Sequence, residues 1–75
     1  MQQNTIAGAI SPIIREAHRR ALTGLWRSQW YRLETAGKAP RRVRLTPDGS
    51  AHGWPLAEVE QWMRDRMAER ERTAA

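Results

Sequence analysis

The segment LTGLWRSQWYRL, residues 22–33, places a tight-turn signal directly before a helical pattern. Gly24 favours a turn because glycine readily takes the left-handed backbone conformation that ends a helix. Beyond it, apolar side chains recur at i, i+4 and i+7 and form one stripe, made of Trp26, Trp30 and Leu33. The sequence therefore predicts the turn and second helix of a helix-turn-helix, with that helix over residues 26–36 and Gly37 closing it.

The side of this helix that faces away from the stripe carries side chains suited to DNA. Arginine pairs with guanine and glutamine with adenine, and hydroxyl and guanidinium groups also bind phosphates. We expect Arg27 and Gln29 to read bases, and Tyr31 and Arg32 to fix the register on phosphates. The full set of expected contacts on this helix is Arg27, Ser28, Gln29, Tyr31 and Arg32. The alternative is an ordinary solvent-exposed helix face.

The preceding residues predict the first helix of the pair. Ser11-Pro12 is a helix-start signal, with serine as the N-cap and proline at the first helical position. The helix is expected to end at residue 22 or 23. Its buried stripe would contain Ile13, Ile14, Ala17 and Ala21, and the opposite side would expose Arg15, Arg19 and Arg20 together with Glu16 and His18.

After the second helix, alternation replaces helical periodicity. Val43 and Leu45 alternate with Arg42 and Arg44, which is the period of a half-buried strand. A turn cluster at 46–50 and a return strand at 51–54 complete a short hairpin with an arginine-rich outer face. In the return strand we expect His52 and Trp54 to face the same way.

From Pro55 the pattern is helical again, with an apolar stripe made of Leu56, Val59, Trp62, Met63 and Met67. The stripe fades after Met67, so we expect residues 68–75 to fray. The organisation is then a flexible tail over 1–10, a DNA-binding domain over 11–70 and a frayed end over 71–75. The order helix, turn, helix, hairpin, helix predicts a mostly α fold with a small β-hairpin, a minimal winged helix-turn-helix.

Charge is distributed unevenly along the chain. The net charge is +5, but residues 15–44 hold nine basic and two acidic side chains, a net +7. Residues 45–75 hold four basic and six acidic side chains, a net −2. Such asymmetry favours a polyanionic partner on one side of the molecule, although a solvated basic surface is the alternative. Aromatic and polar residues interleaved with the arginines favour nucleic acid.

Several classes of function and site are excluded or disfavoured. With 75 residues the chain makes one small domain, without room for a catalytic cleft, and its lack of cysteine removes thiolate metal sites. His18 and His52 lack metal-ligand partners at suitable spacing, and no catalytic constellation stands out, so we expect no enzyme, no metal and no cofactor. Neither a membrane span nor a signal peptide is visible, and we expect a cytoplasmic protein.

The four tryptophans are expected to build the core. We assign Trp30, Trp54 and Trp62 to it because large indoles dominate the packing of small domains. Trp26 also fits the core stripe, with a wedge against DNA or against another protomer as the alternative.

An ordered series of residues resembles the AlpA family of phage and prophage regulators. It comprises Leu22-Thr23-Gly24-Leu25, Trp30-Tyr31-Arg32-Leu33, Gly37-Lys38, Pro40, Val43, Leu45, Gly53-Trp54, Glu58-Val59 and Trp62. The resemblance covers about residues 13–70, and that family is close to excisionases with MerR-like winged-helix domains. It implies a recognition helix at 26–36 and a wing at 41–54.

Two departures from the family pattern stand out. Trp26 occupies the place of a small polar helix cap, and Ser50 and Ala51 occupy the wing tip, where a basic residue is common. We therefore expect Arg41, Arg42 and Arg44 to contact phosphates in place of a wing-tip arginine.

The resemblance implies a sequence-specific protein of a mobile element that binds double-stranded DNA. The first hypothesis is an excisionase, or recombination directionality factor, which bends attachment-site DNA and directs a tyrosine or serine integrase towards excision. Several copies would associate on the DNA, because one small module buries only about 600–1,000 Å². The alternatives are a transcriptional regulator that uses the same face and a protein-interaction module of a phage complex.

Overall fold

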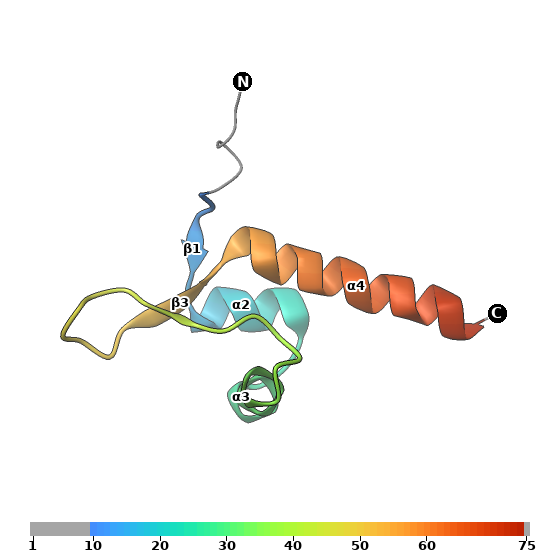
Figure 1. Ribbon diagram of the computed structural model, residues 1–75, viewed down its shortest axis with the longest axis horizontal. Helices are drawn as coiled ribbons and strands as arrows, with labels where there is room; N and C mark the ends of the chain where they lie inside the picture. Colours follow the sequence, from blue (N-terminus) through green and yellow to red (C-terminus); the bar gives the residue numbers. More distant parts are fainter. Residues whose placement is uncertain (1–9, 75) are drawn as a thin grey trace, which may run out of the picture.

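The structure, a computed structural model, describes residues 10–74, which form three helices and a three-stranded sheet. The N-terminal tail expected over 1–10 lies almost wholly outside these residues. In chain order the elements are β1 (Ile13–Ile14), α2 (Glu16–Thr23), α3 (Arg27–Thr35), β2 (Val43–Arg44), β3 (His52–Pro55) and α4 (Leu56–Ala74). Figure 1 shows α4 extending to one side of the molecule while the loop between β2 and β3 extends to the other.

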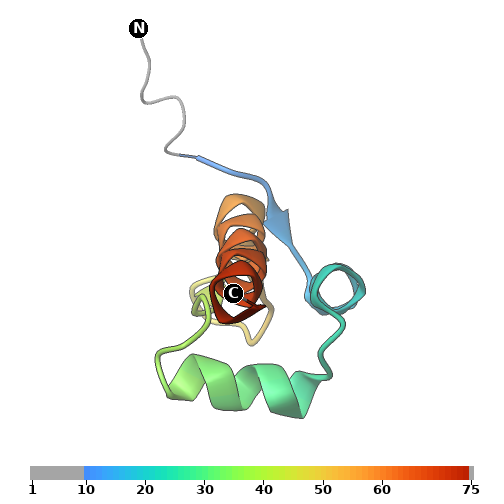
Figure 2. The ribbon, with the colours of Figure 1, turned by 90° about the vertical axis from the view of Figure 1, so that its right-hand side faces the viewer.

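The helix-turn-helix is formed by α2 and α3. Gly24 ends α2 with a φ of 76° and donates its backbone N–H to Arg20 O at 2.8 Å, the left-handed C-terminal cap that the sequence predicted. Gly37 likewise takes a φ of 74° just beyond α3. Figure 2 shows α3 crossing beneath α2 and α4, both of which are seen nearly end-on. The second helix thus has the predicted position, within a residue at each end.

The first helix begins later than expected, because Ile13 and Ile14 form a strand. β1 pairs antiparallel with β3, placing Ile14 opposite Trp54, and β3 pairs on its other edge with β2, so the sheet order is β1-β3-β2. As a strand, Ile14 reaches the core with 5% of its surface exposed. β-branched side chains suit this pleated, half-buried position.

Ser11 caps a helix, but a different one from the helix we predicted. Its Oγ accepts the backbone N–H of Ala57 at 3.0 Å, and Pro12 O accepts the N–H of Leu56 at 2.8 Å. Two of the backbone donors left unpaired at the start of α4 are therefore satisfied from the distant beginning of the domain. With Ile13 and Ile14 in the strand, Ala17 and Ala21 are left exposed on α2.

The core is built around tryptophan, as predicted. Trp30, Trp54, Val59 and Ile14 are buried, and Trp62 packs against them. The Trp30 ring meets those of Trp54 and Trp62 edge to face, at centroid separations of 6.4 and 4.9 Å. Such pairs add to the stabilisation from burial alone.

Trp26 and Arg19 were also assigned to the wrong environment. Trp26, which fitted the apolar stripe, is 65% exposed, because it lies at the N-cap of α3 in an extended conformation. Arg19, expected on the exposed side of α2, is completely buried. Its guanidinium donates to Thr23 Oγ1 and to Leu25 O, forms an ion pair with Glu16, and lies 4.9 Å from the centroid of the Trp30 ring.

The last helix, α4, is longer than expected. It remains helical to Ala74, beyond Met67, where the apolar stripe fades and we expected fraying. Its final turns carry closely spaced opposite charges, among them the i,i+3 ion pair of Arg66 with Glu69, which support an exposed helix.

The architecture is the predicted minimal winged helix, mostly helical with a small antiparallel sheet. The wing consists of β2, β3 and the loop between them, residues 43–55. The sheet gains one strand, β1, that the sequence did not predict. Within residues 10–74, no helix is both long enough and apolar enough to cross a membrane.

Candidate nucleic-acid interface

The outer face of α3 is the first part of the candidate interface. All five side chains predicted to contact DNA, namely Arg27, Ser28, Gln29, Tyr31 and Arg32, are exposed, whereas Trp30 and Glu34 are buried. At about 100° per residue, Ser28 and Arg32 project opposite Trp30. Arg27 and Tyr31 project towards the same side as Glu34, where the wing lies. The exposed face of α3 therefore continues onto the wing.

Gln29 has a structural role as well. Its Oε1 accepts the backbone N–H of Trp26 at 3.1 Å, the bond that a residue at the third helical position makes to the N-cap. Trp26 itself has no side-chain acceptor to offer the helix. Gln29 thus makes one half of a capping box and does not replace the missing acceptor, and its amide nitrogen is the group left to contact a base.

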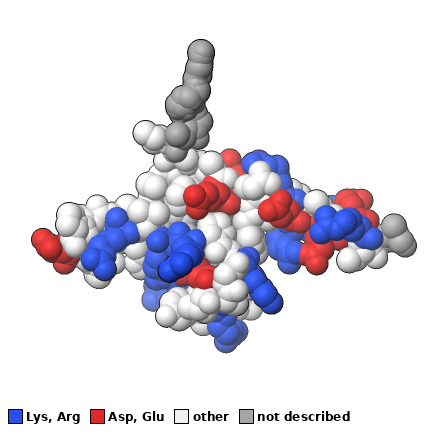
Figure 3. Space-filling model, viewed as in Figure 1, with Lys and Arg blue, Asp and Glu red and all other residues white. Residues whose placement is uncertain are grey.

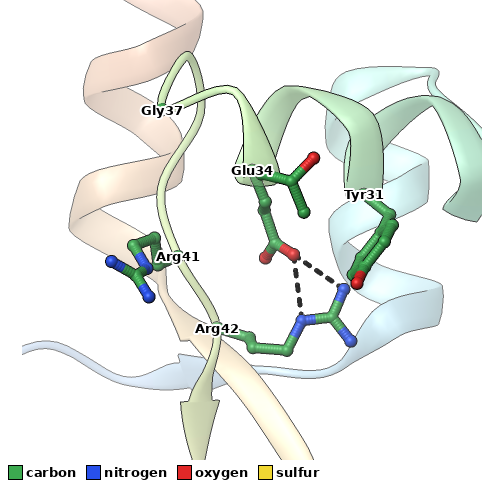
Figure 4. Close-up of a pocket in the computed structure, with 6 residues that line it drawn as sticks. Tyr31, Glu34, Gly37, Arg41 and Arg42 are labelled. Carbon is green, nitrogen blue, oxygen red and sulfur yellow. Dashed lines mark hydrogen bonds and ion pairs between the residues drawn. The ribbon is translucent and has the colours of Figure 1, made fainter.

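A buried carboxylate joins α3 to the wing (Figure 4). Glu34, 7% exposed, accepts Nε and Nη2 of Arg42 on one oxygen, at 2.9 and 2.7 Å. Its other oxygen accepts the indole N–H of Trp54 at 2.6 Å. Both oxygens are satisfied, as a buried charge requires. One side chain therefore ties α3 to the residue directly before the wing and to the core.

Arg42 is placed differently from the prediction of an outward phosphate contact. Besides Glu34, its guanidinium lies 5.4 Å from the centroid of Tyr31 and 5.5 Å from that of Trp54. Arg42, directly before β2, thus faces inward, whereas Val43 and Leu45, expected to be half-buried, are 40% and 38% exposed. Arg44 is exposed as well, so burial does not alternate here as predicted, and Arg42 lies inward because Glu34 offers it a charged partner.

His52 packs within the wing. Its Nδ1 lies 3.1 Å from Ser50 O and its Nε2 lies 3.2 Å from Arg42 Nη1. A hydrogen on Nδ1 satisfies both contacts, because Nε2 then accepts from the arginine. The ring also meets Trp54 edge to face at 5.4 Å, so both side chains lie on one face of β3, as predicted.

A hollow lies between the start of α2, the start of α3 and the wing. We call it the arginine hollow, and its lining comprises Arg15, Glu16, Ala17, Arg27, Arg42, Ser50, Ala51 and His52. Three separate elements bring an arginine to it. Within the lining the acidic group is Glu16, which is already paired with Arg19. The hollow is therefore positively charged and continuous with the exposed face of α3.

The other predicted wing arginines are exposed. Arg44 donates to Pro47 O at 3.2 Å within the wing loop, and Arg41 points away from Glu34 in Figure 4. Figure 3 shows lysine and arginine gathered over the wing and the lower helix, while α4 carries both signs of charge side by side. Of the predicted residues, one hollow brings together Tyr31, Arg41 and Arg42, and the arginine hollow brings together Arg27 and Arg42, whose guanidinium is committed to Glu34.

Arg15 was not among the residues that we predicted to contact DNA. We expected it on a helix, as one of several exposed arginines, but it is the N-cap of α2 and lines the arginine hollow. Its position directly before the first helix of a helix-turn-helix was the available signal. Trp26, for which a wedge against DNA or another protomer was the alternative to core packing, has an exposed ring 4.8 Å from the guanidinium of Arg20.

Among residues 10–74, no group of three or more histidine or acidic side chains could hold a metal ion. The basic, open surface fits an extended anion.

Comparison with protein families gives one match. The model described as Prophage CP4-57 regulatory protein (AlpA) matches residues 12–67. That span begins just before β1 and ends within α4, so it includes the helix-turn-helix, the wing and the arginine hollow. Comparison with curated proteins and with solved structures gives no match.

Proposed function

Because the chain belongs to the AlpA family of prophage regulatory proteins, we propose that it binds duplex DNA through α3 and the wing. The family is one of small DNA-binding regulators and not of enzymes. The observation that carries the proposal is the convergence of Arg15 and Arg27 on the arginine hollow beside the exposed face of α3. In helix-turn-helix proteins that face enters the major groove.

We divide the interface by chemistry. Arg15, Arg32, Arg41 and Arg44 hold phosphates, because they surround the helix and wing and are exposed. Arg27, Ser28 and the free amide nitrogen of Gln29 lie in the first turn of α3, the part of a recognition helix that contacts base edges. Tyr31 fixes the register, held by its contact with Arg42.

Binding should weaken steeply with salt. Phosphate contacts by Arg15, Arg32, Arg41 and Arg44 would give a slope of log K against log salt of about −3.6. Affinity for a duplex then falls about 150-fold between 50 and 200 mM salt. Fluorescence anisotropy with a labelled duplex measures this. Arg32→Ala should reduce the slope by about 0.9. The matched control is Arg72→Ala on α4, which should leave the slope unchanged.

An affinity that stays flat across salt would overturn the phosphate model and would favour a protein-interaction module of a phage complex instead.

Base reading and phosphate binding should separate by mutation. Arg27→Ala should change the preferred sequence in selection from a random duplex pool, with a loss of about 1–3 kcal/mol on the best sites. Arg44→Ala should weaken binding to all sequences alike, because phosphates are the same everywhere. Uniform losses of equal size for both variants would contradict this assignment of roles.

For the role in the cell we propose an excisionase, or recombination directionality factor, which bends attachment-site DNA and directs an integrase towards excision. Its MerR-like winged helix offers one small contact area, so several copies would bind side by side. Bending costs on the order of 1–6 kcal/mol, which added contacts offset. Deletion of the gene should abolish excision of the element, measured by PCR across the rejoined attachment site. Unchanged excision would reject this role.

The second candidate is a transcriptional regulator, which the description of the family as regulatory proteins favours. It uses the same face of α3 and the same wing. A footprint over a promoter, with unchanged excision after deletion, would identify this role. A footprint beside the attachment site, with excision lost, would identify the excisionase.

A further inference from the structure

The second half of α4 carries a charge pattern that reverses about its centre. Residues 64–71 read RDRMAERE. The centre of the pattern lies between Met67 and Ala68. Every charged residue before this centre has a residue of opposite charge at the same distance after it. Three such pairs occur, Arg66 with Glu69, Asp65 with Arg70, and Arg64 with Glu71.

Four of these residues share one face of the helix. Arg64, Met67, Ala68 and Glu71 lie at i, i+3, i+4 and i+7, and we call them the pairing face. All four are exposed, and Met67 keeps 52% of its surface in solvent. The core of the domain is packed by the adjoining side of α4, through Val59, Trp62 and Met63, and Met63 lies one turn before Met67.

The charges on this face are weakly engaged within their own chain. Among the described residues, Arg64 forms a hydrogen bond with Gln61 and no ion pair. Glu71 meets only the neighbouring Arg70, at 3.5 Å, with its side chain 75% exposed. Met67 also lines an apolar hollow with Leu22, Leu25, Leu33 and Met63. The pairing face thus combines unused charges with an exposed apolar centre.

We infer that this face binds the α4 helix of a second copy of the chain, antiparallel, about a two-fold axis between Met67 and Ala68. A two-fold axis brings residue i to residue j and residue j to residue i. Arg64 of each copy then meets Glu71 of the other, and Met67 meets Ala68. A parallel arrangement in register would place like charges together and is disfavoured.

The contact is small and its charges are exposed, so each ion pair contributes little. The pairing would become populated when two copies bind neighbouring DNA sites, because tethering raises their effective concentration to the millimolar range. Figure 1 shows the second half of α4 projecting away from α3 and the wing, so pairing leaves the proposed DNA surface uncovered. In this respect the inference rests on the proposed function.

Cysteine crosslinking tests the arrangement in the whole chain, which has no cysteine of its own. A mixture of Met67→Cys and Ala68→Cys proteins should form disulfide dimers on a 40-base-pair duplex of random sequence. Ala57→Cys, exposed at the far end of α4, is the matched control and should crosslink at least about tenfold less. Equal crosslinking at both positions would overturn the arrangement.

Charge reversal supplies the sharper test. When both proteins of the Met67→Cys/Ala68→Cys mixture also carry Arg64→Glu, crosslinking should fall about tenfold, because like charges then meet across the axis. The same fall is expected when both proteins carry Glu71→Arg. When one protein of the mixture carries Arg64→Glu and the other carries Glu71→Arg, crosslinking should return, because position 64 of each copy again faces a side chain of opposite charge at position 71 of the other. Arg72→Glu, the same charge change outside the pairing face, should change it less than about twofold.

Failure of the mixture to restore crosslinking would overturn the inference. Failure of the pairing can be distinguished from failure of the proposed function, because DNA binding is measured on the same proteins by fluorescence anisotropy. Binding without crosslinking rejects the pairing alone, and crosslinking at high protein concentration without binding rejects the proposed function alone.

Discussion

Replacing Gly53 by alanine is expected to destabilise the domain severely, by about 3 kcal/mol or more. Gly53 is buried in β3, and a Cβ there would lie 2.6 Å from both Ile13 Cγ2 and Ile14 O. The isoleucine side chain could rotate away, but the carbonyl belongs to a strand paired with Trp54 and cannot move alone. The sheet would have to separate at β1, which would also loosen the cap on α4.

Urea unfolding followed by circular dichroism measures this loss. The matched control is Gly37→Ala, where nothing lies within 4 Å of the added carbon and only the positive φ opposes it. That variant should lose about 1–2 kcal/mol. If the two variants were equally stable, β1 would not pack against Gly53 as the structure has it.

The second large effect is expected from Glu34→Ala, which should cost about 3–5 kcal/mol. The substitution leaves the indole N–H of Trp54 without its acceptor inside the core and Arg42 without its counter-charge. Glu34→Gln keeps an acceptor for one of these groups and should lose less. Thermal unfolding by calorimetry or circular dichroism gives both values.

A double-mutant cycle with Arg42→Ala identifies the cause. If Glu34 acts through Arg42, the double variant should cost clearly less than the two single variants together, because the pair is already broken in each. Strict additivity would mean that Glu34 serves Trp54 alone. Variants that lose the Arg42 contact but remain folded at low temperature should also bind DNA more weakly. The reason is that Tyr31 is then no longer held in place by the guanidinium of Arg42.

The helices were predictable where local rules decide. Gly24 and Gly37 mark turns because few other residues accept a positive φ at low cost, and the structure places both in that conformation. Trp30 and Leu33 recur at helical spacing, and Trp54 lies in a segment bounded by turn residues. These signals depend on neighbours within a few positions, so the order of elements and most of the core followed from the sequence.

The errors concern residues whose role is fixed by distant partners. Ile13 and Ile14 form a strand only because β3, some forty residues later, provides an edge. Periodicity also treats arginine as a surface residue, yet Arg19 and Arg42 are held inward by Glu16 and Glu34 and by tryptophan rings. A sequence read alone does not show which carboxylate will lie beside which guanidinium. Arg15 was expected within a helix because β1 was not predicted, and it is β1 that makes Arg15 the N-cap of α2.

The carboxylate of Glu34 bears on which partner, protein or DNA, would have to change shape when the two bind. Because it fixes α3, the residue before β2 and a core indole to one another, the surface that we propose for DNA is preformed and would lose little internal freedom on docking. A duplex whose grooves do not match that surface must supply the change of shape itself. Flexible steps, such as TA and CA, would then be selected at positions that no side chain touches.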